Sequence, residues 1–215
     1  MSVEPAGTSE LLADRAYAEL RDRIVTLAIA PGAPINEDAL GRELEMGRTP
    51  VREAIKRLAL ERLVSVFPRR GTFASEINIT DLAAISDVRV QLESHAAQRA
   101  AERLTPAQGA QLDALVAEID EGSGDADTLM RLDARVHRFV YECAGNAYLQ
   151  ETLERYLNLS LRIWYLVLDR LPYLFDRVHE HRELLLAIRE GDAPRARSIA
   201  AEHVATFEGE IRGVL

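Results

Sequence analysis

Apolar residues recur three or four positions apart along most of this 215-residue chain, the spacing that gathers side chains on one face of an α-helix. The first such stripe consists of Tyr17, Leu20, Ile24 and Leu27. It predicts a helix near the N-terminus. Residues 1–9 lie ahead of this stripe and are small or polar, so we expect them to form a flexible tail.

Two shorter helices are predicted next. Asn36 can cap the first of them, because its side-chain oxygen can accept a hydrogen bond from a free N–H group of the first turn. The second is predicted to start with Thr49 as its cap and Pro50 as its first helical residue, where a missing N–H costs nothing. The apolar face of this helix consists of Val51, Ala54, Ile55 and Leu58.

The opposite face of the same helix is basic. It carries Arg52, Lys56 and Arg57, and Arg48 lies just ahead of the expected cap. A helix with an apolar back and an arginine-rich front end can lie on a phosphate backbone and reach base edges. Taken alone, this segment also fits an ordinary solvated surface helix.

After residue 63 the pattern changes from helical spacing to alternation. Two strands are predicted, at 64–67 and 72–74, and the turn between them contains Arg69, Arg70 and Gly71. The arginines supply the positive charge that a hairpin needs beside the sugar-phosphate backbone, and the glycine allows a close approach. Three helices followed by a basic hairpin predict a winged helix-turn-helix.

The rest of the chain shows helical spacing only. Thr105, Pro106 and Gln108 form a capping box with proline at the first helical position. Six helices without strands predict an α-helical bundle. The expected fold is therefore mainly α, with a winged helix-turn-helix over residues 10–76 and an all-helical domain over residues 77–215.

The net charge of −9 is distributed unevenly. Residues 1–75 hold eleven Lys/Arg and eleven Asp/Glu, so the whole excess of negative charge lies in the remainder of the chain. Residues 47–70 hold seven basic and two acidic residues. Positive charge is thus concentrated where a contact with DNA requires it.

Cysteine content and hydropathy exclude other classes of protein. A single cysteine, Cys143, rules out a disulfide framework and a thiolate zinc cluster. No basic stretch followed by an apolar run marks a signal peptide. The most apolar run, residues 156–168, falls short of the ~20 residues that a membrane span needs. We expect a cytoplasmic protein with no membrane partner.

The basic segment resembles the GntR family of bacterial transcription regulators. The resemblance rests on Arg48-Thr49-Pro50-Val51-Arg52-Glu53-Ala54, Leu58, Leu63-Val64 and Arg70-Gly71-Thr72-Phe73. It implies DNA contacts by the helix and the wing tip, which we assign to Arg48, Thr49, Arg52, Lys56, Arg69, Arg70 and Gly71. Two positions depart from the family pattern. Gly47 stands where Ser or Thr is usual, and Arg62 stands where glycine is usual.

Three helices of the predicted bundle carry polar residues on their apolar faces. Asp133 and His137 lie one turn apart on one helix, and His181 and His203 interrupt the apolar stripes of two others. A buried, unpaired carboxylate costs several kcal/mol, which a bound cation can offset. Carboxylates and histidines on facing helices are one way to build such a site. A hydrogen bond between Asp133 and His137 is the alternative, and it leaves the other two histidines unexplained.

The same positions, together with Gly145-Asn146 and Arg182, resemble the FCD effector domain of the FadR subfamily, and six helices resemble its VanR-like branch. The resemblance implies a divalent metal, completed by a small carboxylate effector, on Asp133, His137, His181 and His203. Three imidazoles and one carboxylate suit Zn²⁺, Ni²⁺ or another first-row ion, and this ligand set does not choose among them. Arg89 and Arg162 lie among apolar residues and are candidates to pair with the effector. Packing of their stems beneath exposed head groups is the alternative.

Together these features predict a ligand-responsive transcription regulator, with repression relieved by effector, that binds a palindromic operator as a homodimer. A metal-dependent hydrolase built on a helical bundle is the alternative from another class. That alternative leaves no evident general base beside the ligands and no role for the wing. A helical scaffold protein does not account for Arg48, Arg52 and the wing. We therefore expect no enzymatic activity.

Overall fold

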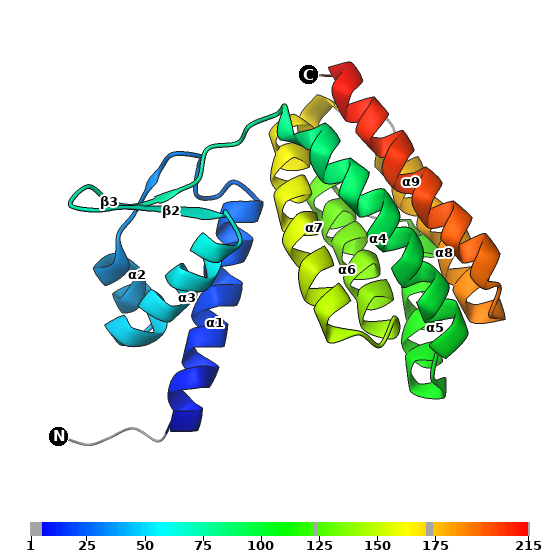
Figure 1. Ribbon diagram of the computed structural model, residues 1–215, viewed down its shortest axis with the longest axis horizontal. Coiled ribbons are helices and arrows are strands. Elements are labelled where there is room, and N and C mark those ends of the chain that lie inside the picture. Colours follow the sequence, from blue (N-terminus) through cyan, green and yellow to red (C-terminus); the bar gives the residue numbers. More distant parts are fainter. Residues whose placement is uncertain (1–5, 123, 171–173, 215) are drawn as a thin grey trace. The chain divides into compact units, whose positions relative to one another are not determined.

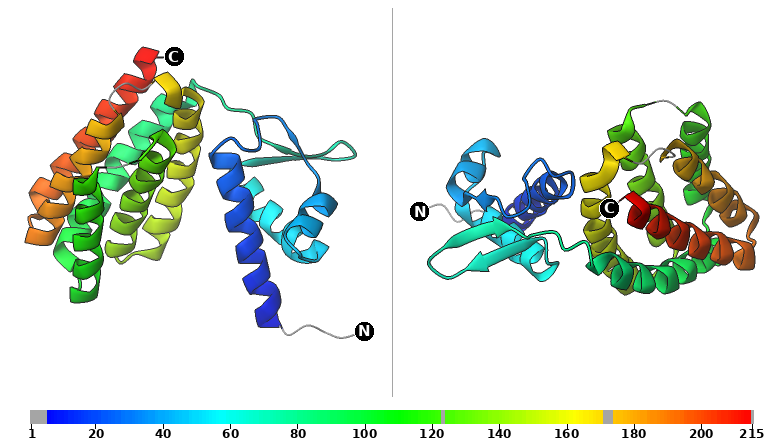
Figure 2. Two further views of the ribbon diagram at one scale, coloured as in Figure 1. Left: turned by 180° about the vertical axis from the view of Figure 1, so that it is seen from behind. Right: turned by 90° about the horizontal axis from the view of Figure 1, so that it is seen from above.

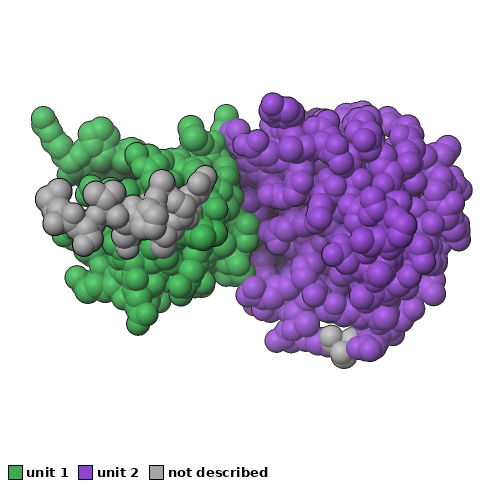
Figure 3. Space-filling view, turned by 90° about the horizontal axis from the view of Figure 1, so that it is seen from below, with its two compact units in different colours: residues 1–78 green, residues 79–215 purple. Residues whose placement is uncertain are grey.

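The computed structural model describes the backbone of residues 6–122, 124–170 and 174–214, and the side-chain surroundings of residues 11–122, 124–170 and 178–214. Within these ranges the chain is mainly helical, with one small sheet (Figure 1). It divides into two compact units, Met1–Asn78 and Ile79–Leu215 (Figure 3). The division lies two residues beyond the boundary expected from the sequence.

The first unit is a winged helix-turn-helix. Its elements are α1 (Ala6–Val25), β1 (Pro34–Ile35), α2 (Glu37–Glu43), α3 (Arg48–Leu60), β2 (Val64–Phe67) and β3 (Gly71–Ala74). The strands form an antiparallel sheet in the order β1-β3-β2, with Ser65 opposite Phe73. Helices α1 and α3 pack closely, and Leu20, Val51 and Leu58 are fully buried in the core. The mainly helical fold with a small hairpin wing is as predicted.

Helix α1 begins earlier than its apolar stripe indicates. It starts at Ala6, so residues 6–9 are helical instead of belonging to a tail. Residues 1–5 of the expected tail lie outside the described residues. The physical reason is cooperativity, because a helix that is already nucleated gains one hydrogen bond for each residue that extends it.

The start of α3 also corrects the prediction. Arg48 is the first helical residue and Gly47 is the N-cap, so Thr49 does not cap the helix. Gly47 has an extended backbone and makes no side-chain capping bond. Pro50 is still accommodated, because the first four N–H groups of a helix have no intrahelical partner in any case.

The second unit is built from helices. They are α4 (Asp81–Arg103), α5 (Pro106–Glu121), α6 (Ala126–Cys143), α7 (Ala147–Val167), the 3₁₀ helix η1 (Leu168–Arg170), α8 (Leu174–Glu190) and α9 (Ala193–Val214). Figure 2 shows these α-helices standing side by side around a shared interior. Helix α4 packs along α9 and also contacts α6, α7 and α8. None of the described helices is long and apolar enough to cross a membrane.

Local signals position the helices that carry the polar cluster. The capping box of α5 forms as predicted, with Gln108 N–H donating to Thr105 Oγ1. Asn146 accepts from the N–H of Leu149 at the start of α7, and Asp192 accepts from the N–H of Arg195 at the start of α9. These caps fix where each helix starts, and thereby which side chains face the interior.

Candidate functional site

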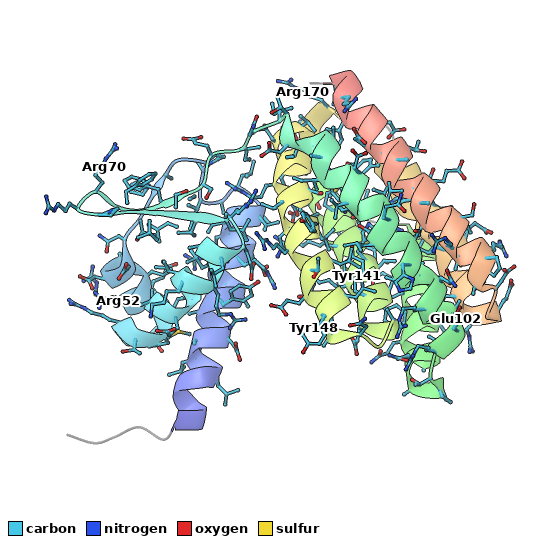
Figure 4. All side chains as sticks on the ribbon, in the orientation of Figure 1. Arg52, Arg70, Glu102, Tyr141, Tyr148 and Arg170 are labelled. Atoms are coloured by element: carbon cyan, nitrogen blue, oxygen red, sulfur yellow. The ribbon has the colours of Figure 1, made fainter. Side chains whose placement is uncertain are left out.

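The first candidate surface is the exposed front of α3. Its back is buried, whereas Arg48, Arg52 and Lys56 are exposed, and Figure 4 shows Arg52 extending outward from its helix. Arg52 Nε lies 2.9 Å from a carboxylate oxygen of Glu37, and Arg48 Nε lies 2.8 Å from Asp38. The helix therefore presents its arginines at the surface, each held by an acidic residue.

Glu37 and Asp38 were not predicted to take part in this surface. Both lie in the first turn of α2, where a carboxylate is favoured by the helix dipole. Exposed ion pairs of this kind contribute about 0–1 kcal/mol each, so an arginine can exchange its carboxylate for DNA at small cost. The only sequence signal was the pair of acids directly after the Asn36 cap.

The wing presents its positive charge on a tight turn. The N–H of Arg70 donates to the carbonyl of Phe67 at 3.1 Å, and Arg70 extends from the end of the hairpin (Figure 4). Arg69 has a φ of 65° and Gly71 a φ of 107°. Both values lie in the left-handed region, which favours glycine. Arg69 therefore adopts a backbone conformation that is unfavourable for a residue with a side chain. Both wing arginines are exposed, as a phosphate contact requires.

The second candidate site lies inside the helical unit. Asp133 and His137 on α6, His181 on α8 and His203 on α9 each offer one ligand atom, and these atoms lie within 4.8 Å of one another. All four residues are buried. The structure thus brings together side chains from three helices that are up to seventy positions apart in sequence.

Two of the three histidines of this cluster contact carboxylates outside it. His137 Nδ1 lies 2.8 Å from Glu93 on α4, and His203 Nδ1 lies 3.2 Å from Glu180 on α8. A carboxylate accepts, so each ring donates through Nδ1, and in its neutral form each ring carries a lone pair on Nε2. Carboxylate–histidine pairs of this kind are typical of metal sites.

Four buried atoms of the cluster have no hydrogen-bond partner among the described residues. These atoms are Asp133 Oδ2, His137 Nε2, His181 Nδ1 and His203 Nε2. The hydrogen bond weighed as an alternative does not form, because 3.8 Å separates His137 Nε2 from Asp133 Oδ2. Asp133 Oδ1 instead pairs with His181 Nε2 at 2.8 Å. A carboxylate and three imidazoles with unused acceptor atoms fit a divalent transition-metal ion.

The electrostatics of the cluster favour the protonation states that metal binding needs. Burial alone would raise the pKa of Asp133, but the attraction of His137 and the contact with His181 hold that pKa well below its usual range. Burial and the neighbouring His203 lower the pKa of His181 to about 4, against the opposing effect of Asp133. At neutral pH the carboxylate is ionised and His181 is neutral.

The two arginines expected to meet the effector are both buried. Arg89 on α4 and Arg162 on α7 have their head groups inside the unit, so neither reaches the surface as in the alternative considered above. Arg89 Nε donates to Glu93 at 2.6 Å, and its guanidinium lies 4.9 Å from the ring centre of Trp164. Arg89 is thereby linked to His137 through Glu93.

A pocket of about 300 Å³ opens beside the cluster, between α8 and α9. His203 contributes to its wall, and Glu180, Glu183 and Glu202 make the rest of the lining strongly acidic. This acidic character favours cations near the cluster. The two remaining histidines of the chain, His95 and His179, are exposed and do not belong to the cluster.

Comparisons with known proteins match both units of the chain to families. The FCD domain family matches residues 84–206, and the family of bacterial regulatory proteins named gntR matches residues 12–74. A transcriptional regulator in an unstable DNA locus of Streptomyces ambofaciens is 29% identical over 201 residues, which is 92% of this chain and 84% of the relative. The transcriptional repressor RspR of Escherichia coli is 26% identical, over 92% of this chain and 88% of the relative.

Solved structures share the fold. The chain of E. coli McbR/YncC superimposes with a TM-score of 0.82 at 24% identity, covering 94% of this chain and 97% of the other. A GntR regulator from Rhodococcus gives a TM-score of 0.70 at 22% identity, covering 94% and 98%. The relatives and both families are regulators, not enzymes, which argues against the hydrolase. The chain belongs to the GntR family of DNA-binding transcription regulators and carries an FCD effector domain.

Proposed function

We propose that this regulator is a homodimeric repressor that binds a palindromic operator and senses a small carboxylate beside a metal ion in its helical unit. The observation that carries this proposal is the buried cluster of Asp133, His137, His181 and His203, whose ligand atoms converge within 4.8 Å while acceptor atoms on all four residues lack a partner. The proposed location of the protein is the cytoplasm, because a bacterial transcription regulator meets its operator there.

The proposed sensing site uses residues of the helical unit only. Asp133 and the three histidines hold the ion, which is Zn²⁺ or Ni²⁺ in this proposal. When bound, the ion supplies open coordination positions for a carboxylate. Arg89 and Arg162 are buried and are the residues that would pair with the rest of an anionic ligand, Arg89 through N–H groups other than the Nε–H bonded to Glu93. Burial of the site keeps water from competing with that ligand.

The repressor assignment draws on relatives. RspR and the galactonate operon repressor of E. coli carry that description in their names, and the second is 27% identical over 94% of this chain. Effector binding to the helical unit then changes the affinity for the operator, with a coupling that is typically 5–150-fold. A dimer is required because a palindromic site presents two half-sites about one DNA turn apart, or a multiple of that. Light scattering that finds a monomer at micromolar concentration contradicts the dimer.

The DNA-binding part is tested by fluorescence anisotropy with DNA from upstream of the protein's own gene. Arg52→Ala should weaken binding, whereas Arg212→Ala should not. The control is matched, because the side chains of both arginines are 59% exposed and each has an acidic partner, Glu37 and Glu208 respectively. Equal binding by both variants would refute the assigned role of α3.

The sensing part is tested on the same DNA. Protein loaded with Zn²⁺ is titrated with a panel of small mono- and dicarboxylates, and one of them should lower operator affinity at least fivefold. The effect should disappear in His203→Ala, whereas binding to DNA without effector should remain. A response that is equal in wild type and His203→Ala places the sensor outside this cluster.

A further inference from the structure

The contact between Glu93 and His137 reaches the proposed metal centre from a helix that supplies none of its ligands. Glu93 lies on α4, whereas Asp133 and His137 lie on α6, His181 on α8 and His203 on α9. The side chains of Glu93 and His137 are both 4% exposed, and 2.8 Å separates their polar atoms. We propose that Glu93 is a positioning residue that fixes the tautomer of His137, and that Arg89 in turn fixes Glu93.

Each oxygen of Glu93 has its own main partner, and the hydroxyl of Tyr141 also interacts with Glu93 and lies 3.5 Å from His137 Nδ1. Oε1 accepts from Arg89 Nε at 2.6 Å, and Oε2 faces His137 Nδ1 at 2.8 Å. Arginine can only donate, so it always requires an acceptor on its side of the carboxylate. Both neighbours present N–H groups to Glu93, so Glu93 is the acceptor toward each of them.

The tautomer of His137 follows from this arrangement. A neutral imidazole has one N–H, and an acceptor beside Nδ1 keeps that hydrogen on Nδ1. Nε2 then carries the lone pair that a metal ligand needs, and it is the nitrogen without a hydrogen-bond partner among the described residues. Glu93 thus prepares His137 for the ion without contacting the ion.

Glu93→Gln should reverse the tautomer of His137, although glutamine has nearly the same size and shape as glutamate. Its single oxygen must face Arg89, which can only donate, so its NH₂ group faces His137 Nδ1. Nδ1 must then accept, which moves the ring hydrogen to Nε2 and blocks the ligand position. If Arg89 is also replaced, the glutamine oxygen no longer has to accept a hydrogen bond from an arginine. In Arg89→Met/Glu93→Gln the amide can turn its oxygen to His137 and restore the original tautomer.

The chain offers a matched comparison. Glu180 faces His203 Nδ1 at 3.2 Å in the same way, but its side chain is 40% exposed. Water can replace an exposed carboxylate as an acceptor, so Glu180→Gln should change the affinity for metal much less than Glu93→Gln. The two variants make the same chemical change beside two histidines of one cluster.

The test measures the dissociation constant of Zn²⁺ for the full chain by competition with a chelating dye. Glu93→Gln should weaken binding about 10–100-fold, the range for partners of metal-bound histidines. Glu180→Gln should stay within about threefold of wild type, and Arg89→Met/Glu93→Gln should recover at least half of the loss on a logarithmic scale. If Glu93→Gln binds as wild type does, or the double variant binds no better than Glu93→Gln, the inference is wrong although the metal site stands.

A second measurement needs no variant. In protein labelled with ¹⁵N-histidine, long-range ¹H–¹⁵N spectra distinguish the two tautomers, and metal-free His137 should carry its hydrogen on Nδ1. Hydrogen on Nε2 overturns the inference even if Glu93→Gln fails to fold. The inference rests on the metal site proposed above. If wild type itself binds no Zn²⁺, the metal site is wrong and the inference falls with it.

Discussion

Chelation of divalent ions should lower the melting temperature of this protein by several degrees. A ligand that binds only the folded state stabilises it by about 2.7 kcal/mol when its free concentration is a hundred times its dissociation constant. Unfolding entropy is about 2.1 cal/mol/K per residue, so a unit the size of residues 79–215 loses roughly 0.3 kcal/mol of stability per degree. Together these values give a shift of about 9 °C.

The assay is thermal unfolding followed by circular dichroism, with and without added Zn²⁺ or Ni²⁺ after removal of the chelator. His137→Ala, His181→Ala and His203→Ala should each abolish most of the metal-induced shift. Each variant also loses a buried ring, so its own metal-free melting temperature is the reference. His179→Ala should keep the full shift, because His179 is exposed and lies ~200° around α8 from His181.

Two results together would refute the reasoning. One is elemental analysis that finds no metal in protein purified without chelator. The other is the absence of any thermal shift when ions are added. The cluster would then be a buried hydrogen-bond network. Loss of the shift in His179→Ala but not in His181→Ala would place a metal site elsewhere on the molecule.

Three further predictions concern DNA binding and pH. Arg52→Ala should reduce the free energy of binding to operator DNA by about 1–3 kcal/mol and relax the preference at one symmetric base pair. Arg69→Ala should weaken binding to all DNA sequences alike and lower the slope of log affinity against log salt by about one unit. Binding titrations at several salt concentrations separate the two effects. Asp38→Asn frees Arg48 and should raise affinity for DNA up to about fivefold, so weaker binding contradicts it. Because the pKa of His181 falls from 6.5 to about 4 on folding, the unfolded chain binds more protons in this range. The free energy of unfolding of metal-free protein should therefore decrease from pH 6.5 to pH 4, and denaturant titrations that show a constant value refute this.

Much of the fold was predictable because its signals are local. Asn36 and Thr105 were predicted as caps from residue type alone, and each accepts the expected backbone N–H. The wing followed from a change of periodicity and a glycine-ended turn. Thr49 was assigned wrongly, because Gly47 can start a helix without any side-chain bond and so leaves no signal in the sequence.

The buried face of α4 shows where pattern reading fails. Val88 and Leu92 have the spacing of an apolar stripe, yet both are only partly buried, whereas Arg89 and Glu93 are buried. A reading by hydrophobicity treats charged residues as exposed. Hydrophobicity alone does not show that two opposite charges four residues apart can pair with each other in a core. An Arg-x3-Glu pair within an apolar helix was the signal available.

The candidate metal cluster was predictable in membership but not in its surroundings. Each histidine interrupts an apolar stripe, so the pattern within its own helix is enough to predict that it is buried. The contacts of Glu93 with His137 and of Glu180 with His203 join different helices. Such contacts depend on how the helices pack, and no spacing along the chain encodes that. Sequence reasoning therefore found the candidate ligands and missed the residues that orient them.

The left-handed backbone of Arg69 has a consequence for how this protein can change under selection. A left-handed non-glycine residue costs roughly 1–2 kcal/mol, so Arg69→Gly would make the wing easier to fold. The same change deletes a charge from the tip that we expect to contact the phosphate backbone. At position 69, folding stability thus favours glycine, whereas affinity for DNA favours arginine. A lineage that relaxed its demand for tight operator binding would be free to drift toward glycine there.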